Sequence, residues 1–341
     1  MLPAATTPSE HGRPSVDPGS RGRIEEEPVP AKPAHLPVLL SEVVERLAPR
    51  PGAVLVDGTL GLGGHASDLL AAIQPGGRLY GIDRDPRAVA LASERLSEFG
   101  EAFVPVRGDH TDLRALLAGH GVFAVDGILL DLGVSSMQLD DPERGFSFRK
   151  DGPLDMRMDP LAPTTAADLL ASESEDELRR ILKTYGEERA ARAIAREIVR
   201  LRQKSPLTRT TELARLVERV LGPAARRFRI HPATRTFQAL RVAVNQEVVV
   251  LERLVGDAVS LLRRSGRLAV IAYHSLEDRA IKHTYRALAN CCTCPRRLPR
   301  CGCGKENLIR VVTRKPVRPG TDEIERNTRA RSARLRVAER L

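Results

Sequence analysis

Long apolar runs are missing from this sequence, and cysteine is confined to one short segment. No stretch approaches the ~20 apolar residues of a membrane-spanning helix, and the N-terminus has no apolar signal core. We therefore expect a cytoplasmic protein without a membrane partner. All five cysteines lie within residues 291–303, which favours reduced thiols or a metal site over the disulfide framework of a secreted protein.

Aromatic residues are also scarce, because the chain has no Trp and its aromatic share is only 3%. Its 341 residues, 42% of them hydrophobic, still suffice for a globular core, in two domains or in one large domain with an insertion. The formal net charge is +10, and residues 291–341 hold 14 Lys and Arg against 5 Asp and Glu. This excess indicates a polyanionic partner, most simply nucleic acid, although a solvated Arg-rich surface explains it equally well.

A glycine-rich turn near the start of the chain is its most informative stretch. A β-branched run ends at Asp57, the turn follows, and residues 66–73 have helical spacing. Glycines in such a turn let backbone N–H groups approach a ligand closely. A second strand pattern at 78–82 leads to Asp83, where a carboxylate can accept hydrogen bonds from the ribose of an adenosine. Together these features predict an adenosine cofactor rather than a turn used only for packing.

The spacing of the turn narrows the choice of cofactor. No Gly-Lys-Ser/Thr follows, which excludes a Walker-type phosphate loop, and Gly61-x-Gly63-Gly64 fits a dinucleotide fingerprint poorly. S-adenosyl-L-methionine carries no phosphate, and its sulfonium cation tolerates carboxylates such as Asp57 and Asp131. We predict S-adenosyl-L-methionine, with NAD as the alternative.

Strand and helix patterns alternate as far as Asp131, with further strands at 102–107 and 125–130. This alternation predicts a doubly wound, mostly parallel α/β sheet whose ligand residues lie at the carboxyl ends of the strands. His110 follows the third of these strands. The alternation then stops, and residues 139–235 carry a loop-like segment followed only by helical patterns, which predicts an inserted helical subdomain.

Beyond the insertion, one long helical pattern runs from residue 236 to 265. It precedes a strand at 267–273, and two later strand patterns at 307–313 and 333–337 have no obvious helix between them. A sheet that closes with such a hairpin suits a methyltransferase better than a dehydrogenase. His274, directly after the strand at 267–273, either contacts substrate or caps the helix that begins there.

Seven strings in one order carry a resemblance to a known family: DGTLGLGGH at 57–65, ILLDLGVSS at 128–136, DPERGFSF at 141–148, GPLDMRMD at 152–159, TYGEER at 184–189, HPATRTFQ at 231–238 and HSLEDR at 274–279. The chain resembles the bacterial 16S rRNA (cytosine-N4) methyltransferases, RsmH, formerly MraW. The resemblance implies a class I S-adenosylmethionine-dependent fold with a helical insertion. It also implies methylation of the N4 amine of a cytosine in the decoding region of 16S rRNA, within the small ribosomal subunit.

The resemblance implies cofactor contacts at seven positions: Gly63, Gly64, His65, Asp83, His110, Asp131 and Gln138. Other members often have an aromatic ring where this chain has His110. The implied organisation is a methyltransferase domain at 35–138 and 236–341, with an RNA-recognising insertion at 139–235. Residues 1–34 hold too few large apolar side chains to offset their ordering entropy, so we expect a disordered tail.

Asp131 is the expected catalytic residue, because a cytosine amine is a poor nucleophile that must be oriented by a hydrogen-bond acceptor. It has an alternative role, binding the methionine part of the cofactor. The motif is Asp-Leu-Gly-Val-Ser-Ser rather than the Asp-Pro-Pro-Tyr of many amino-methyltransferases, so it supplies no ring to stack on the target base.

Three matters stay open at the level of sequence. No metal is assigned to the catalytic site, but two Cys-x-Cys pairs, Cys292/Cys294 and Cys301/Cys303, are candidate zinc ligands. The oligomeric state is undetermined. Besides methyl transfer, the alternatives are an RNA-binding ribosome-assembly factor without turnover and an NAD-dependent oxidoreductase.

Overall fold

The computed structural model describes residues 37–223, 230–292, 294 and 302–341. The expected tail, residues 1–34, lies outside the described residues, as does Cys301. Within the described ranges, no helix combines the length and the apolar character needed to cross a lipid bilayer.

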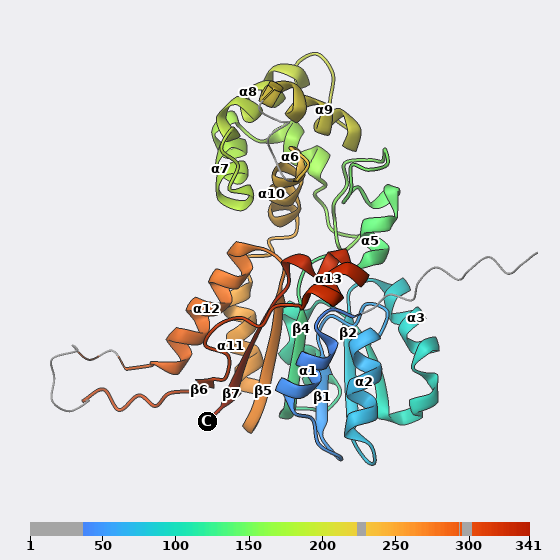
Figure 1. The fold of residues 1–341 in the computed structure, drawn as a ribbon, viewed down its shortest axis with the longest axis vertical. Coiled ribbons are helices and arrows are strands. Elements are labelled where there is room, and N and C mark those ends of the chain that lie inside the picture. Colours follow the sequence, from blue (N-terminus) through green and yellow to red (C-terminus); the bar gives the residue numbers. More distant parts are fainter. Residues whose placement is uncertain (1–36, 224–229, 293, 295–301) are drawn as a thin grey trace, which may run out of the picture. The chain divides into compact units, whose positions relative to one another are not determined.

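A seven-stranded sheet with the order β3-β2-β1-β4-β5-β7-β6 forms the centre of the fold (Figure 1). Strands β1 to β5 pair in parallel, whereas β7 is antiparallel to both β5 and β6. This arrangement confirms the predicted doubly wound sheet and its C-terminal hairpin. The bounds of the strands are β1 Val54–Asp57, β2 Arg78–Asp83, β3 Phe103–Arg107, β4 Val125–Asp131, β5 Leu262–Ala272, β6 Ile309–Val311 and β7 Arg334–Arg340.

Helices cover both faces of this sheet, because the strands are apolar on either side. One hydrophobic cluster joins the sheet to α1 (Leu40–Leu47), α2 (Gly64–Ile73) and α3 (Pro86–Arg95). A second cluster, on the other face, joins it to α4 (Leu113–Gly119), α11 (Leu251–Leu261) and α12 (Ser275–Ala289). The order of the strands reverses beside β1, so the carboxyl ends of β1 and β4 border the crevice where such folds bind ligands.

The helices from α5 to α10 share a separate hydrophobic core, which includes Leu178, Ile194, Leu213 and Phe237. Side-chain caps mark the beginnings of two of them, because the hydroxyls of Thr165 and Ser174 accept backbone N–H groups one turn later. The bounds of the helices in this region are α5 Ser136–Asp140, α6 Ala166–Ser172, α7 Glu175–Gly186, α8 Ala191–Arg202, α9 Thr210–Leu221 and α10 Thr234–Val244.

The single long helix predicted from residue 236 is wrong, since the structure has two helices, α10 and α11, with a break between them. Asn245 causes the break: its amide donates to the carbonyl oxygens of Met156 and Arg241, both at 2.8 Å, and accepts the N–H of Met158 at 2.8 Å. The next residue, Gln246, has a φ of 52°. The polar side chain therefore ties α10 to the loop at residues 156–158.

The connection between β6 and β7 also differs from expectation. It contains the short helix α13 (Thr321–Arg326), where the sequence showed no obvious helix. Glu323 in this helix accepts the backbone N–H of Leu39 at 2.7 Å, so the connection is fixed to the first helix of the fold.

The tight contact between α7 and α10 leads to a prediction about the stability of a Gly186 variant. A methyl group on Gly186 would lie 2.5 Å from the carbonyl oxygen of Arg235, whereas one on Gly256 in α11 meets no atom within 4 Å. Gly186→Ala should lower the free energy of unfolding by about 1–3 kcal/mol through overpacking. Gly256→Ala, the matched control, should raise it by up to about 1 kcal/mol because alanine favours helix. Urea denaturation measures both, and equal midpoints would contradict the close packing of α7 on α10.

Candidate functional site

The carboxyl ends of the parallel strands border a cavity of about 420 Å³, which lies within the roughly 300–1,000 Å³ of typical small-molecule sites. The loops after β1, β2 and β4 form much of its wall, and residues 327–329 and Ser332 close another side. Of the seven predicted cofactor contacts, six line it: Gly64, His65, Asp83, His110, Asp131 and Gln138.

Gly63 is not among the lining residues, and backbone geometry explains why this position is a glycine. It is the N-cap of α2 with a φ of 73°, a left-handed conformation that favours glycine. A Cβ there would lie 3.0 Å from the Cδ1 atom of Leu96. Gly63 thus shapes the turn against α3, and a direct contact with the cofactor stays a prediction.

Asp83 joins the turn to the end of β2. Its Oδ2 atom accepts the N–H of Gly61 at 2.9 Å, and its Oδ1 atom accepts the N–H of Asp85 at 2.9 Å. Burial raises the pKa of the carboxyl, and these two backbone donors oppose that rise. Each oxygen keeps a further lone pair, so the carboxylate can still accept hydrogen bonds from a pair of ribose hydroxyls.

Most N–H groups of the turn are used inside the protein rather than for a ligand. Besides the bond from Gly61, Thr59 donates to the carboxylate of Asp57 at 3.1 Å, and Leu60 and Gly63 donate to backbone carbonyls at 2.9 and 2.8 Å. The expected approach of these N–H groups to a ligand is therefore wrong for these four residues. A phosphate would find no donors among them, which fits a phosphate-free cofactor.

Asp131 ends β4 and is held by three neighbours. Its Oδ1 atom accepts the hydroxyl of Tyr273 at 2.8 Å, its Oδ2 atom lies 3.8 Å from Nδ1 of His65, and its backbone N–H donates to Oγ1 of Thr59 at 2.6 Å. Burial raises the pKa of the Asp131 carboxyl, while His65 and the tyrosine hydroxyl lower it. Deeper in the fold, burial likewise raises the pKa of Asp57 to about 6.

Tyr273 is positioned by the start of α12. Its backbone N–H donates to Oε2 of Glu277 at 2.9 Å, and the N–H of Glu277 donates to Nδ1 of His274 at 3.3 Å. The backbone N–H of His274 in turn donates to Oε2 of Glu277 at 3.3 Å, and this reciprocal pair of bonds confirms the capping role of His274. Although burial pushes its pKa up, contact with His274 and the charge of Arg241 hold the pKa of Glu277 below its usual value.

His110 lies between the first cavity and a second one of about 280 Å³. Burial and the adjacent charge of Arg84 lower its pKa to about 4, so the imidazole is neutral at pH 7. The second cavity is more polar, and Asn245, Glu247 and Glu277 line it. The two cavities share Thr59, Arg84, His110, Leu132, Gly133 and Met158.

Comparison with known proteins now decides the family. The model of the MraW methylase family matches residues 32–341. The chain belongs to the MraW methylase family. Three curated relatives are named ribosomal RNA small subunit methyltransferase H: those of Trichlorobacter lovleyi (56% identical over 90% of this chain and 98% of the relative), Geobacter sulfurreducens (54%, 90% and 99%) and Carboxydothermus hydrogenoformans (49%, 90% and 98%).

This MraW methylase uses S-adenosyl-L-methionine as its cofactor, and the alternative of an NAD-dependent oxidoreductase is set aside. The residues of the first cavity fit this cofactor by their chemistry. Asp83 offers acceptors for ribose, and Asp131 places a carboxylate where a cationic ligand offsets the cost of its burial. S-adenosyl-L-methionine supplies a methyl group bound to a sulfonium.

Several residues that line the cavities of this MraW methylase were not predicted from the sequence. Tyr273 follows β5 directly, so the rule that ligand residues follow strands was sufficient to find it. Arg241 and Asn245 lie within a continuous helical pattern and gave no such signal. Residues 327–329 and Ser332 reach the cavity only because β7 inserts between β5 and β6.

The contacts of Asp83 predict a loss of cofactor affinity in Asp83→Ala. The variant removes charge-assisted acceptors for the ribose, and we expect binding of S-adenosyl-L-methionine to weaken by about 1.5–3 kcal/mol. Isothermal titration calorimetry measures this loss. Asp68→Ala, on the exposed face of α2, is the control and should bind normally. Unchanged affinity in a folded Asp83→Ala protein, or tighter binding of NADH by the unmutated chain, would contradict the assignment.

Proposed function

We propose that this chain methylates 16S rRNA, transferring the methyl group of S-adenosyl-L-methionine to the N4 amine of a cytosine in the decoding region, nucleotide 1402 in the usual rRNA numbering. The names of the relatives support an rRNA substrate. The observation that favours an amine is the half-buried carboxylate of Asp131, which faces the cofactor cavity while one of its oxygens accepts the Tyr273 hydroxyl.

This geometry suits the orientation of an amine. The lone pair of the cytosine amine is delocalised into the ring, so an acceptor must hold its N–H bonds while the nitrogen faces the methyl group. Tyr273 donates to Oδ1 of Asp131, and Oδ2 lies 3.8 Å from the His65 ring. Oδ2 is therefore the acceptor for an N–H of the target. In the alternative role, the same oxygen binds the ammonium group of the cofactor.

The second cavity provides a place for the target base. It shares six lining residues with the first, so an occupant of one lies beside an occupant of the other. Enzymes that modify a base take it out of its stack and hold it in such a pocket. Neutral His110 borders both cavities, and Tyr273 is the only Phe, Tyr or Trp ring in the described lining of either one. These rings are the candidates to contact a base.

The helical insertion is the proposed RNA-recognition subdomain, within the domain limits given above. Its α7–α8 turn lies near the site, because Oε1 of Glu187 is 3.3 Å from Nη2 of Arg279 in α12. Arg189 lies in this turn and Arg192 in the first turn of α8, and both are exposed. Guanidinium groups at such a position contact phosphates, and phosphate contacts set the affinity and register of an RNA.

Asp131→Asn separates the two roles of the carboxylate. The variant keeps an acceptor oxygen and removes the charge. For the proposed role, affinity for S-adenosyl-L-methionine should stay within about threefold while single-turnover methylation of 30S particles falls roughly a hundredfold or more. If affinity collapses instead and saturating cofactor restores the rate, Asp131 binds the cofactor. Absence of methyl transfer by the unmutated protein, on 30S particles and on naked 16S rRNA, would favour the assembly-factor alternative.

A charge reversal tests the insertion. The double variant Arg189→Glu/Arg192→Glu should bind S-adenosyl-L-methionine normally, but its affinity for 30S particles should fall at least about tenfold and depend less steeply on salt. The control, Arg50→Glu/Arg78→Glu, makes the same change of charge at two exposed residues where β1 and β2 begin, away from the carboxyl ends. Equal losses of 30S affinity in the two double variants would show a general effect of charge and contradict recognition by the insertion.

A further inference from the structure

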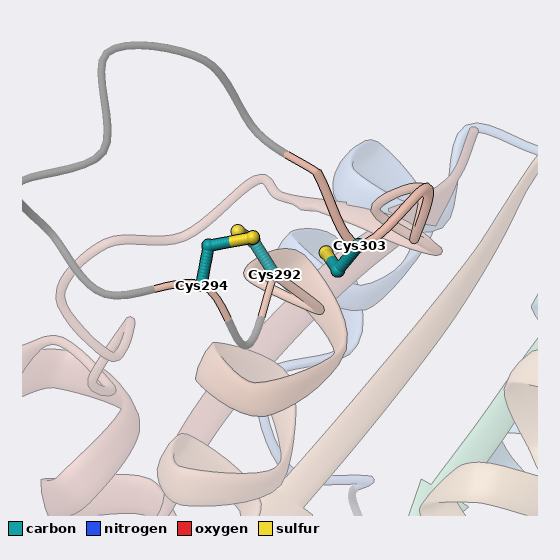
Figure 2. Close-up of side chains that lie close together, drawn as sticks. All are labelled: Cys292, Cys294 and Cys303. Atoms are coloured by element: carbon teal, nitrogen blue, oxygen red, sulfur yellow. The ribbon is translucent and has the colours of Figure 1, made fainter.

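Three cysteines that the methyl-transfer site does not use come together after α12. Cys292 and Cys294 follow the last turn of this helix, and Cys303 lies on the returning segment that leads to β6. Figure 2 shows the sulfur of Cys303 turned toward those of the other two. The three Sγ atoms all lie within 4.8 Å of one another.

This separation matches the needs of a zinc ion. Four thiolates at about 2.3 Å from zinc are about 3.8 Å apart, so small side-chain rotations bring these sulfurs onto one ion. Thiolate donors select zinc over the hard cations magnesium and calcium. Cys301, grouped with them in the sequence, lies outside the described residues, and the fourth ligand position is assigned to no described residue.

One backbone donor already points at a sulfur of this cluster. The N–H of Gly302 donates to Sγ of Cys294 at 3.3 Å. Such hydrogen bonds stabilise the negative charge of a metal-bound thiolate and orient it. The contact also crosses between the outgoing and the returning segments, because Gly302 adjoins Cys303.

A second group of ligand-type side chains, Glu247, His274 and Glu277, is equally compact but differs in its partners. The carboxylate of Glu247 is bound by the guanidinium of Arg241, with distances of 2.8 and 2.9 Å. Glu277 accepts the N–H groups of Tyr273 and His274. An arginine thus supplies the positive charge in that cluster, and the cysteine cluster is the better metal site.

We propose that Cys292, Cys294 and Cys303 bind a structural zinc ion that fastens the connection between α12 and β6. Both ends of this connection are already joined, since Leu308 donates its N–H to the carbonyl of Leu288 at 2.9 Å and Cys291 donates its N–H to Oδ1 of Asn307 at 3.1 Å. The ion adds a cross-link further along the same connection. It stabilises the fold and takes no part in methyl transfer.

Metal content tests the site directly. The full chain is isolated under reducing conditions without an affinity metal, dialysed against excess zinc and desalted, and its zinc is measured by mass spectrometry. We expect about one zinc ion per chain in the unmutated protein and a content at least about fivefold lower in Cys292→Ser and Cys303→Ser. Cys291→Ser is the matched control, because its Sγ contacts the Leu288 carbonyl at 3.3 Å outside the cluster, and it should keep the ion.

Thermal unfolding gives an independent readout. A chelator should lower the melting temperature of the unmutated protein and of Cys291→Ser, zinc should restore it, and Cys303→Ser should respond to neither. The proposal would be overturned if the unmutated protein held no zinc after reconstitution, or if Cys303→Ser and Cys291→Ser held equal amounts. A disulfide between cysteines of the cluster, found in protein kept under reducing conditions, would overturn it as well. None of these measurements involves RNA, so their outcome is independent of the proposed methyl transfer.

Discussion

The cost of burying carboxylates at neighbouring strand ends governs the architecture of this site. Asp57, Asp83 and Asp131 are drawn toward the protein interior by the sheet that they terminate, and burial raises the pKa of each one. Each is stabilised by a hydrogen-bond donor: backbone N–H groups of the turn for the first two, and the Tyr273 hydroxyl for the third. A cationic cofactor bound in the cavity that Asp131 lines, as we propose, would reduce the remaining cost.

The same constraint explains how the insertion is attached. Arg144, at the beginning of the insertion, binds the carboxylate of Asp85 at 3.2 Å and the carbonyl oxygens of Arg157 and Met158 at 2.9 Å. Asn245, beyond its end, binds the same loop from the other side. Met158 is therefore fixed from two directions, and it lines both cavities. The RNA-recognition subdomain that we propose shares a wall with the methyl-transfer site.

Much of the fold could be predicted from the sequence because strand and helix patterns alternate with clear boundaries. Strand ends at Asp83 and Asp131 follow from that alternation, and parallel strands bring their ends to one edge. The helix expected from residue 236 failed because apolar periodicity continues through residues 245–250. The half-buried side chain of Asn245 makes hydrogen bonds to a loop distant in the sequence, and these outweigh helical propensity there. No local pattern indicates such a partner.

The sequence by itself determined the doubly wound sheet, the C-terminal hairpin, the family and six residues of the cavity wall, because these depend on local periodicity and on motifs of fixed spacing. Only the tertiary structure decided that the N–H groups of the turn are consumed internally, that Tyr273 holds Asp131, and that Cys303 meets Cys292 and Cys294. Those facts join residues far apart in the chain. Their distances are set by how the strands and loops pack, which spacing along the sequence does not encode.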